Sequence, residues 1–157
     1  MTHAFTAAIA ARDVEALIGT LAPDVVLHSA VTRVPFAGRE VVADTYRSVL
    51  EAFEELRVVD EFESGDTHAF FWEGRMGGRE VCGADRLRLD ADGQVSEITV
   101  LGRPMAGVAT FLTEIGPRLA RRRRGGLVAK LLRYSALPLP PMLGSLDPVS
   151  RWILRQS

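Results

Sequence analysis

Asp85, His28 and His68 are the side chains in this sequence best suited to acid/base chemistry. Asp85 stands in a stretch whose neighbours are expected to be apolar, and a carboxyl group in such surroundings is poorly solvated. Poor solvation raises the pKa of a carboxyl group and favours its neutral form. A neutral acid can donate a hydrogen bond to a developing enolate or return a proton to carbon. Histidine is the side chain most often used as a base near neutral pH, so the two histidines are the candidate bases.

Each of these candidates also has a purely structural interpretation. Asp85 can be a buried acid paired with Arg33 or His68, and a core histidine is often satisfied by local hydrogen bonds. The other candidates would line a pocket for a bulky apolar molecule, although aromatic side chains at these spacings are also typical of a core. They are Ser29, Phe36, Tyr46, Phe70, Trp72, Ile98, Val100 and Arg103, the last of which would bind a substrate carboxylate or cap a strand end.

The hydrophobic periodicity predicts helices in the first third of the chain and strands after it. Residues 2–12 are alanine-rich, residues 14–21 follow an Asp13 cap, and residues 39–56 repeat apolar side chains at helical spacing. Pro23-Asp24 is expected to end the second helix before a strand at 25–31. The period then changes to two, which predicts strands at 57–63, 67–76, 79–89 and 95–101. This order favours an α+β domain with helices on one side of a curved antiparallel sheet.

The Gly77-Gly78 turn allows the two strands around it to be aligned. In a two-residue hairpin, Phe70 would lie opposite Asp85, and Trp72 and His68 would share their face. That face is apolar and aromatic with one acid in its middle, whereas the opposite face is charged. We therefore expect Asp85 to point toward the helix-covered side of the sheet.

The predicted order of helices and strands, together with four short sequence segments, resembles that of the nuclear transport factor 2-like superfamily. The segments are Asp13-Val14-Glu15-Ala16-Leu17, Ala22-Pro23-Asp24-Val25, Phe36-Ala37-Gly38-Arg39-Glu40 and Asp85-Arg86-Leu87-Arg88-Leu89-Asp90 with Gly93. Within that superfamily the chain is similar to the SnoaL-like branch, which includes polyketide cyclases and is related to ketosteroid isomerases, and the resemblance covers roughly residues 3–115. It implies a cone-shaped α+β barrel with a deep apolar pocket, a small apolar ligand, and a homodimer packed through the outer face of the sheet.

The same resemblance compares this chain with the three active groups of ketosteroid isomerases, a carboxylate base, a tyrosine and a protonated aspartate. The base position falls on Ser29 and the tyrosine position on Phe5, while the aspartate is kept as Asp85. A serine does not shuttle protons at neutral pH and a phenylalanine donates no hydrogen bond. Steroid isomerisation by that particular mechanism is therefore not expected, whereas acid/base chemistry as an isomerase, cyclase or hydrolase of a bulky apolar carbonyl compound is.

Length and composition limit the remaining function classes. The 157 residues fit one domain, and 47% hydrophobic with 25% charged residues is ordinary for a globular protein. A single cysteine, Cys82, excludes an intrachain disulfide and favours a reducing, cytoplasmic location. No residues have the spacing of a zinc site, a calcium loop or a phosphate-binding glycine loop, so neither a metal nor a cofactor is expected.

The net charge of −1 is the sum of an acidic N-terminal part and a basic C-terminal part of the chain. Residues 118–157 hold nine arginines or lysines against the single acid Asp147, which gives +8 and leaves −9 for residues 1–117. We therefore predict a barrel domain at 1–117 and a basic helical extension at 118–157. The run Arg121–Arg124, followed by apolar stretches and Trp152, suits either the acidic body of the same protein or an anionic membrane surface. A protein partner is a further alternative, and nucleic acid is not expected because too few aromatic side chains are available for stacking.

Overall fold

The computed structural model describes residues 3–145 of the chain, so the predicted basic and apolar positions Arg151, Trp152 and Arg155 lie outside the described residues. The N-terminal part contains α1 (Ala4–Ala11), α2 (Val14–Gly19), β1 (Leu21–His28), β2 (Phe36–Ala37) and α3 (Arg39–Ala52). Four long strands follow, namely β3 (Phe53–Ser64), β4 (Thr67–Met76), β5 (Arg79–Leu89) and β6 (Val95–Arg103). The last helices are α4 (Met105–Thr110), the π-helical turn η1 (Phe111–Ile115), α5 (Gly116–Arg124), α6 (Gly126–Ala136) and α7 (Leu139–Gly144).

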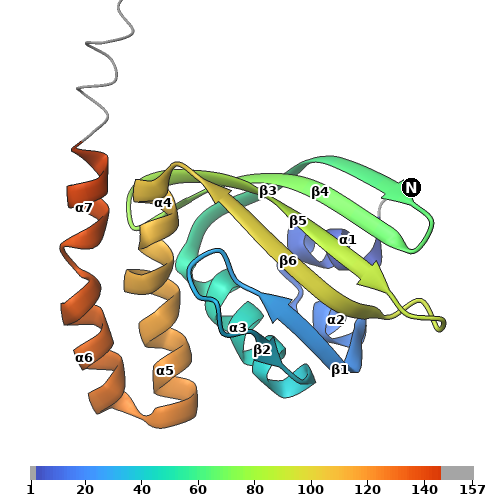
Figure 1. The fold of residues 1–157 in the computed structure, drawn as a ribbon, viewed down its shortest axis with the longest axis horizontal. Helices are drawn as coiled ribbons and strands as arrows, with labels where there is room; N and C mark the ends of the chain where they lie inside the picture. The colour runs from blue at the N-terminus through green and yellow to red at the C-terminus, as the bar shows by residue number, and fades with distance from the viewer. Residues whose placement is uncertain (1–2, 146–157) are drawn as a thin grey trace, which may run out of the picture.

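The strands form one curved, open sheet in the order β2-β1-β6-β5-β4-β3, and helices α1 to α3 lie against its concave side (Figure 1). This arrangement confirms the α+β class and the position of the helices. One detail of the prediction is wrong, because β1 pairs with β6 in parallel and the sheet is therefore mixed. The long chain segment between these two strands permits this, since parallel neighbours need an extended crossover connection.

The register expected from the Gly77-Gly78 turn is confirmed. Phe70 lies opposite Asp85, Trp72 opposite Gly83 and His68 opposite Leu87 in the β4–β5 ladder. Both turn glycines have positive φ angles, 57° and 70°, which is the backbone conformation that a two-residue hairpin turn requires. The turn residues therefore set which side chains of β4 and β5 face the helices.

Two predicted elements, α3 and β1, have wrong boundaries. Helix α3 ends at Ala52 rather than at residue 56, because Phe53 already pairs with Met76 as the first residue of β3. Strand β1 begins at Leu21 and contains Pro23, which the sequence analysis placed at a break, and it ends at His28 rather than at residue 31. Pro23 is tolerated because the β1–β6 register shifts between Leu21 and Val26, so no ladder bond there requires its missing N–H.

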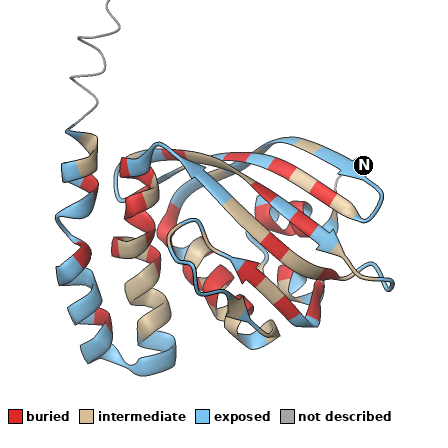
Figure 2. Ribbon diagram, viewed as in Figure 1, coloured by how far each residue is buried: buried red, intermediate tan, exposed pale blue. Residues whose placement is uncertain are grey.

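The core lies between the concave sheet face and the N-terminal helices. Its largest fully buried side chains include Phe5, Leu17, Phe70, Met76 and Ile98, which come from α1, α2, β4 and β6. By contrast, most of α6 and α7 is exposed (Figure 2). The C-terminal helices therefore depend on fewer buried contacts than the sheet does.

Helix α5 continues directly from α4 and η1, and α6 runs back alongside it (Figure 1). Arg122 forms an ion pair with Glu51, and Arg123 Nη1 lies 2.9 Å from Asp44 Oδ2, so α5 is attached to α3 by charge. Part of the basic stretch thus folds over the acidic body of the same chain. Residues 117 and 118 both lie within α5, so the helix runs through the predicted domain boundary.

Within residues 3–145, no helix combines the length and the apolar character needed to cross a membrane.

Candidate active site

Asp85 is buried on the concave face of β5 and accepts a hydrogen bond from the indole of Trp72. The Trp72 Nε1–H donates to Asp85 Oδ1 over 2.7 Å, and both side chains are 6% exposed. Two strand neighbours on the same face thus form a polar pair inside an apolar layer. The predicted partners of this acid are different, since Arg33 is exposed and His68 bonds elsewhere.

Burial raises the pKa of Asp85 to about 7, well above its ordinary value of 3.8. The hydrogen bond that Trp72 donates to the carboxylate opposes this rise in pKa. At neutral pH the carboxyl group is therefore divided between its acidic and basic forms. This is the condition under which one side chain can both accept and return a proton efficiently.

Tyr46 on α3 places a hydroxyl group next to Asp85. Its ring is buried and packs edge-on against Phe5, with ring centroids 5.3 Å apart. Burial and the charge of Asp85 raise the pKa of Tyr46 well above its ordinary value, so the hydroxyl keeps its proton. That hydroxyl has no hydrogen-bond partner of acceptable geometry among the described residues. A buried donor without a partner is costly, and a ligand oxygen would remove that cost.

Gly83 allows the Trp72 indole to occupy its position over β5. A Cβ atom at residue 83 would lie 2.5 Å from the indole ring and 2.1 Å from the carbonyl oxygen of Leu101 on β6. Both distances are far below a normal contact, so no side chain fits there. The absent side chain leaves the space that the Trp72 indole occupies while it donates to Asp85.

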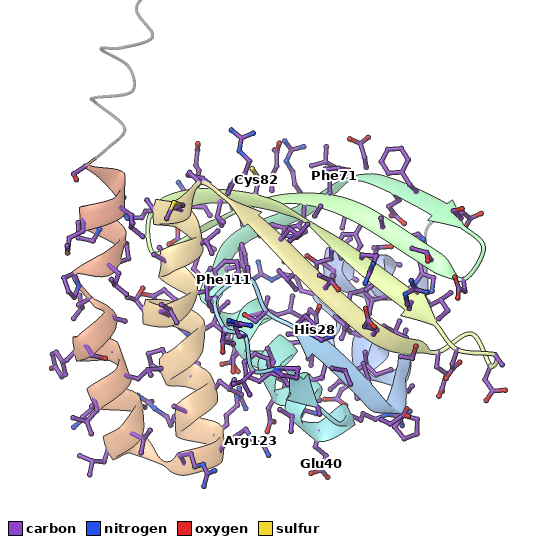
Figure 3. The ribbon with its side chains drawn as sticks, in the orientation of Figure 1. His28, Glu40, Phe71, Cys82, Phe111 and Arg123 are labelled. Carbon is purple, nitrogen blue, oxygen red and sulfur yellow. The ribbon has the colours of Figure 1, made fainter. Side chains whose placement is uncertain are left out.

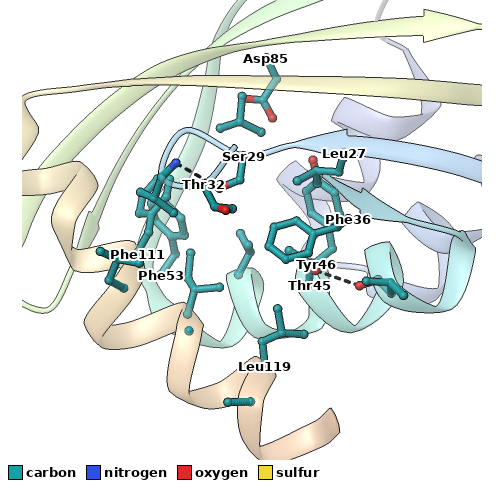
Figure 4. A pocket seen from close by; sticks show the side chains of 18 of the residues that line it. Leu27, Ser29, Thr32, Phe36, Thr45, Tyr46, Phe53, Asp85, Phe111 and Leu119 are labelled. Carbon is teal, nitrogen blue, oxygen red and sulfur yellow. Dashed lines mark hydrogen bonds between the residues drawn. The ribbon is translucent and has the colours of Figure 1, made fainter. Parts of the chain in front are cut away.

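A cavity of 430 Å³ opens beside Asp85 and Tyr46. Its wall is almost entirely apolar and comes from β1 and the loop after it, from α3, from the concave sheet face, and from η1, α5 and α6. In the close view, Asp85 lies on one side of this pocket and Leu119 of α5 on the opposite side (Figure 4). The size and the lining are typical of a site for a small molecule.

The structure brings together most of the side chains that the sequence analysis selected for a pocket. Those that line the cavity with Asp85 are Ser29, Phe36, Tyr46, Phe70, Trp72 and Val100. The Ser29 hydroxyl accepts a hydrogen bond from the Val31 amide over 3.2 Å, so it is held as an acceptor rather than placed as a base.

Four selected residues lie outside the cavity, namely His28, His68, Ile98 and Arg103. His28 is exposed because Leu27 and Ser29 face the cavity and successive strand residues alternate between faces. Ile98 is fully buried in the core but does not reach the cavity wall. Arg103, at the end of β6, is exposed and lies opposite Cys82 in the ladder, away from Asp85.

His68 lies on the predicted concave face but belongs to a separate buried cluster under the start of α1. Its Nε2 atom lies 3.1 Å from Glu61 Oε2, and its ring centroid lies 4.9 Å from that of His3. Thr6 and the backbone amide of His3 also contact Glu61 Oε2, at 2.9 and 3.1 Å. Burial lowers the pKa of His3, and the charge of His68 lowers it further. This cluster does not line the cavity, so neither histidine is placed as a base for a ligand there.

The contribution of the C-terminal helices to the cavity was not predicted from the sequence. Phe111, Ile115 and Leu119 lie on its wall and repeat at every fourth residue, and Arg123 continues the series. This helical spacing was available in the sequence as a signal for an amphipathic helix. What it did not indicate was which side of the sheet the helix would cover.

Within residues 3–145, no group of three or more His, Cys, Asp or Glu side chains is arranged to hold a metal ion. Figure 3 shows Cys82 and Phe71 on the convex side of the sheet, away from the cavity.

Comparisons with known proteins agree with the fold and with the family resemblance. A family model described as the SnoaL-like domain matches residues 2–98. A comparison with curated proteins finds no match.

Several solved structures are similar to this chain. A steroid delta-isomerase from Pseudomonas aeruginosa shares 32% sequence identity over 78% of this chain and 88% of its own, with a TM-score of 0.65. An uncharacterised protein with a cystatin-like fold from Silicibacter pomeroyi shares 22% identity over 76% and 82%, with a TM-score of 0.67. An NTF2-like protein of unknown function from Cytophaga hutchinsonii shares 16% identity over 64% and 85%, with a TM-score of 0.52. At their lower identities, the last two support the fold alone.

Proposed function

Because this chain belongs to the SnoaL-like domain family, we propose that its cavity binds a bulky apolar carbonyl compound and catalyses proton transfer next to the carbonyl group. The observation that carries this proposal is the position of Asp85. It is a buried carboxyl group with a pKa of about 7, held by Trp72 on the wall of an apolar cavity. An isomerase-like or cyclase-like reaction requires such a group in contact with the substrate.

The proposed step uses two side chains. The Tyr46 hydroxyl donates a hydrogen bond to the carbonyl oxygen, while the Asp85 carboxylate removes a proton from the adjacent carbon. The C–H electron pair forms a carbon–carbon double bond while the π pair of the carbonyl group moves onto its oxygen, which gives an enolate. Asp85 then returns its proton to a conjugated carbon. No atom is gained or lost overall, so the product is an isomer of the substrate.

Asp85 carries this chemistry because the other candidate bases lie elsewhere. His28 is on the opposite face of β1, His68 is held by Glu61, and Ser29 accepts a backbone hydrogen bond. Trp72 fixes Oδ1 of Asp85, which leaves Oδ2 for the substrate. The proposal therefore differs from the ketosteroid isomerase arrangement, since one carboxyl group carries the proton and Tyr46 approaches from α3.

A pH–rate profile with a Δ5-3-ketosteroid tests this function. The similarity to a steroid delta-isomerase suggests this probe, and the conjugated enone product is followed by its ultraviolet absorbance. We expect the rate to rise with pH through about 7, as Asp85 ionises, and to fall by about 10²- to 10⁴-fold in Asp85→Asn. Asp92→Asn, an exposed acid in the turn before β6, is the matched control and should keep the parent rate.

Two other outcomes of that experiment contradict the proposal in different ways. A rate that falls as pH rises through 7 would assign Asp85 as a hydrogen-bond donor to the carbonyl oxygen instead of a base. Binding that needs Asp85 and Tyr46 but gives no turnover, with this steroid or with polyketide-like ketones, would favour a ligand-binding module.

A docking role for the C-terminal helices is the second candidate function. The apolar side chains of Leu127, Leu131 and Tyr134 are 65–75% exposed on α6, beside Lys130 and Arg133. Apolar and basic side chains on one helix suit an anionic membrane surface. Cosedimentation with vesicles of anionic and of zwitterionic lipid tests it, with Leu127→Ser/Leu131→Ser expected to reduce binding to the anionic vesicles alone.

A homodimer is a separate proposal, supported by three exposed apolar side chains on the convex sheet face. Phe62, Phe71 and Leu101 are 50–63% exposed, and the two phenylalanine rings pack edge to face 6.1 Å apart. Light scattering of the parent and of Phe71→Ser tests whether this face joins two copies.

A further inference from the structure

Two arginines from the last turn of α5 line the same cavity as Asp85. Leu119, Ala120, Arg123 and Arg124 all contribute to the wall, and their spacing places them on one face of the helix. Arg123 lies between α5 and α3 at the end of the helix farthest from η1 (Figure 3). The cavity wall therefore includes two exposed arginines at one end of α5.

The two guanidinium groups are not equally neutralised. Arg123 is paired with Asp44, and Asp44 is shared with Arg47, whose Nη1 lies 3.4 Å from it. Arg124 forms no ion pair or hydrogen bond with any of residues 3–145. Arg122 pairs with Glu51 and Arg121 is exposed, and neither lines the cavity. One wall position thus carries a cation that its surroundings leave without a counter-ion.

The polar side chains of the cavity therefore differ between its two sides: they are hydrogen-bonding groups on the sheet side and arginines on the α5 side. Asp85, Tyr46 and Trp72 can bond an uncharged oxygen on the sheet side, while Arg123 and Arg124 attract an anion on the α5 side. Figure 4 shows Asp85 and the α5 residue Leu119 on opposite sides of the pocket, with mostly apolar side chains between them. The arrangement is that of a site for a molecule with an apolar body and two different ends.

We infer that the natural ligand is an amphiphilic carboxylate: an apolar molecule whose carbonyl or hydroxyl oxygen lies at Asp85 and Tyr46 and whose carboxylate group meets Arg124 and Arg123. This inference rests on the proposed function, because it assumes that the cavity binds its ligand with an oxygen at Asp85. It adds the charge of the ligand and its orientation. Guanidinium groups suit this task because they bind carboxylates through two parallel hydrogen bonds.

Matched acid and ester probes test the inference. We would use 3-oxo-4-androstene-17β-carboxylic acid with its methyl ester, and dodecanoic acid with methyl dodecanoate. Binding is followed by the fluorescence of Trp72 in a Trp152→Phe background, which leaves Trp72 as the only tryptophan. We expect each acid to bind about three- to tenfold more tightly than its ester, with an advantage that shrinks at high salt.

Two arginine variants separate a specific contact from the general positive charge of α5. Arg124→Gln should remove most of the advantage of the acid over the ester, while leaving ester binding unchanged. Arg121→Gln removes the same charge from the same helix turn outside the cavity, so it should keep the advantage. Equal losses in both variants, or equal affinities of acid and ester in the parent, would overturn the inference.

The same titrations distinguish failure of the inference from failure of the proposed function. If the steroid ester binds the parent and loses affinity in Asp85→Asn, but the acid gains nothing, the function stands and the inference is wrong. If acid and ester bind unchanged in Asp85→Asn, the ligand does not use Asp85 and both are wrong. If none of the four probes binds, the apolar amphiphile class is wrong and so is the inference.

Discussion

Two buried polar clusters share the concave side of this sheet, and they differ in how completely their hydrogen bonds are satisfied. Around Glu61, one carboxylate oxygen contacts His68, Thr6 and the backbone amide of His3, all within 2.9–3.1 Å. Around Asp85, one oxygen accepts a single bond from Trp72 and the neighbouring Tyr46 hydroxyl has no partner. The first cluster joins α1 to β3 and β4, whereas the second faces an open cavity.

This contrast separates a partly buried acid with a structural role, Glu61, from a buried acid that is available for chemistry, Asp85. A saturated cluster recovers the cost of burying polar groups within the fold, so it stabilises the native state. In an unsaturated cluster beside a cavity, part of the desolvation cost is not compensated within the fold, and a ligand that forms the missing hydrogen bonds would compensate it. Composition alone does not distinguish the two, because each holds a carboxyl group, an aromatic ring and a hydroxyl.

The largest expected effect is on the pH dependence of stability at Asp85. Its pKa is about 7 in the folded protein and 3.8 when solvated, so unfolding favours ionisation and the free energy of unfolding falls as pH rises from about 4 to about 7. The full penalty above pH 7 corresponds to about 4 kcal/mol. We therefore expect Asp85→Asn to be more stable than the parent at pH 8 and similar to it at pH 4. Urea unfolding of both proteins between these pH values measures the difference, and parallel curves would contradict it.

Glu61→Gln should destabilise the protein, in contrast to Asp85→Asn, and by a smaller change in the free energy of unfolding. The amide carries no charge, so its oxygen accepts the same three contacts more weakly, and we expect the free energy of unfolding at pH 7 to fall by about 1–3 kcal/mol. Glu63→Gln, an exposed acid two residues further along β3, is the control and should change little. If Glu61→Gln instead stabilises the protein as Asp85→Asn is expected to, the distinction between the two clusters is wrong.

Removing one hydroxyl group from each cluster compares the two clusters most directly, and it should give the smallest changes in the free energy of unfolding. The Thr6 hydroxyl lies 2.8 Å from the His3 carbonyl oxygen and 2.9 Å from Glu61, so Thr6→Val should lower the free energy of unfolding by about 1 kcal/mol. Tyr46→Phe removes a buried hydroxyl without a partner, so it should raise the free energy of unfolding by about 1 kcal/mol. The order reverses for ligand affinity, which Tyr46→Phe should weaken and Thr6→Val should leave intact. Equal stability losses would show that both hydroxyls are bonded in solution.

The sequence predicted most of what two-residue periodicity and turn chemistry can determine. The positive-φ glycines of the β4–β5 turn fixed a register in which Asp85, Phe70 and Trp72 share one face. Helical periodicity predicted the three N-terminal helices, and the family resemblance implied the cone shape and the cavity. The turn and the periodicity are local signals, and the family resemblance is carried by short segments of sequence.

What sequence could not predict depends on contacts between distant segments. Whether Asp85 bonds Trp72 rather than His68 follows from the side-chain packing over Gly83, which no pattern along β5 reveals. The face of His28 depended on a β1–β6 register that is irregular before Val26. The same holds for α5, whose amphipathic spacing indicated a helix but not that Arg123 and Arg124 would reach the cavity.

Gly83 has a consequence for how this site can change during evolution. Because a side chain there would collide with the Trp72 indole and with the backbone of β6, neither neighbour can accommodate it alone. Relatives that carry a larger residue at this position should also carry a smaller one in place of Trp72 and a wider spacing between these strands. Such relatives would lose the donor that orients Asp85. A glycine at position 83 in a homologous sequence is therefore a marker for an Asp85 carboxyl group that is oriented by a Trp72 indole.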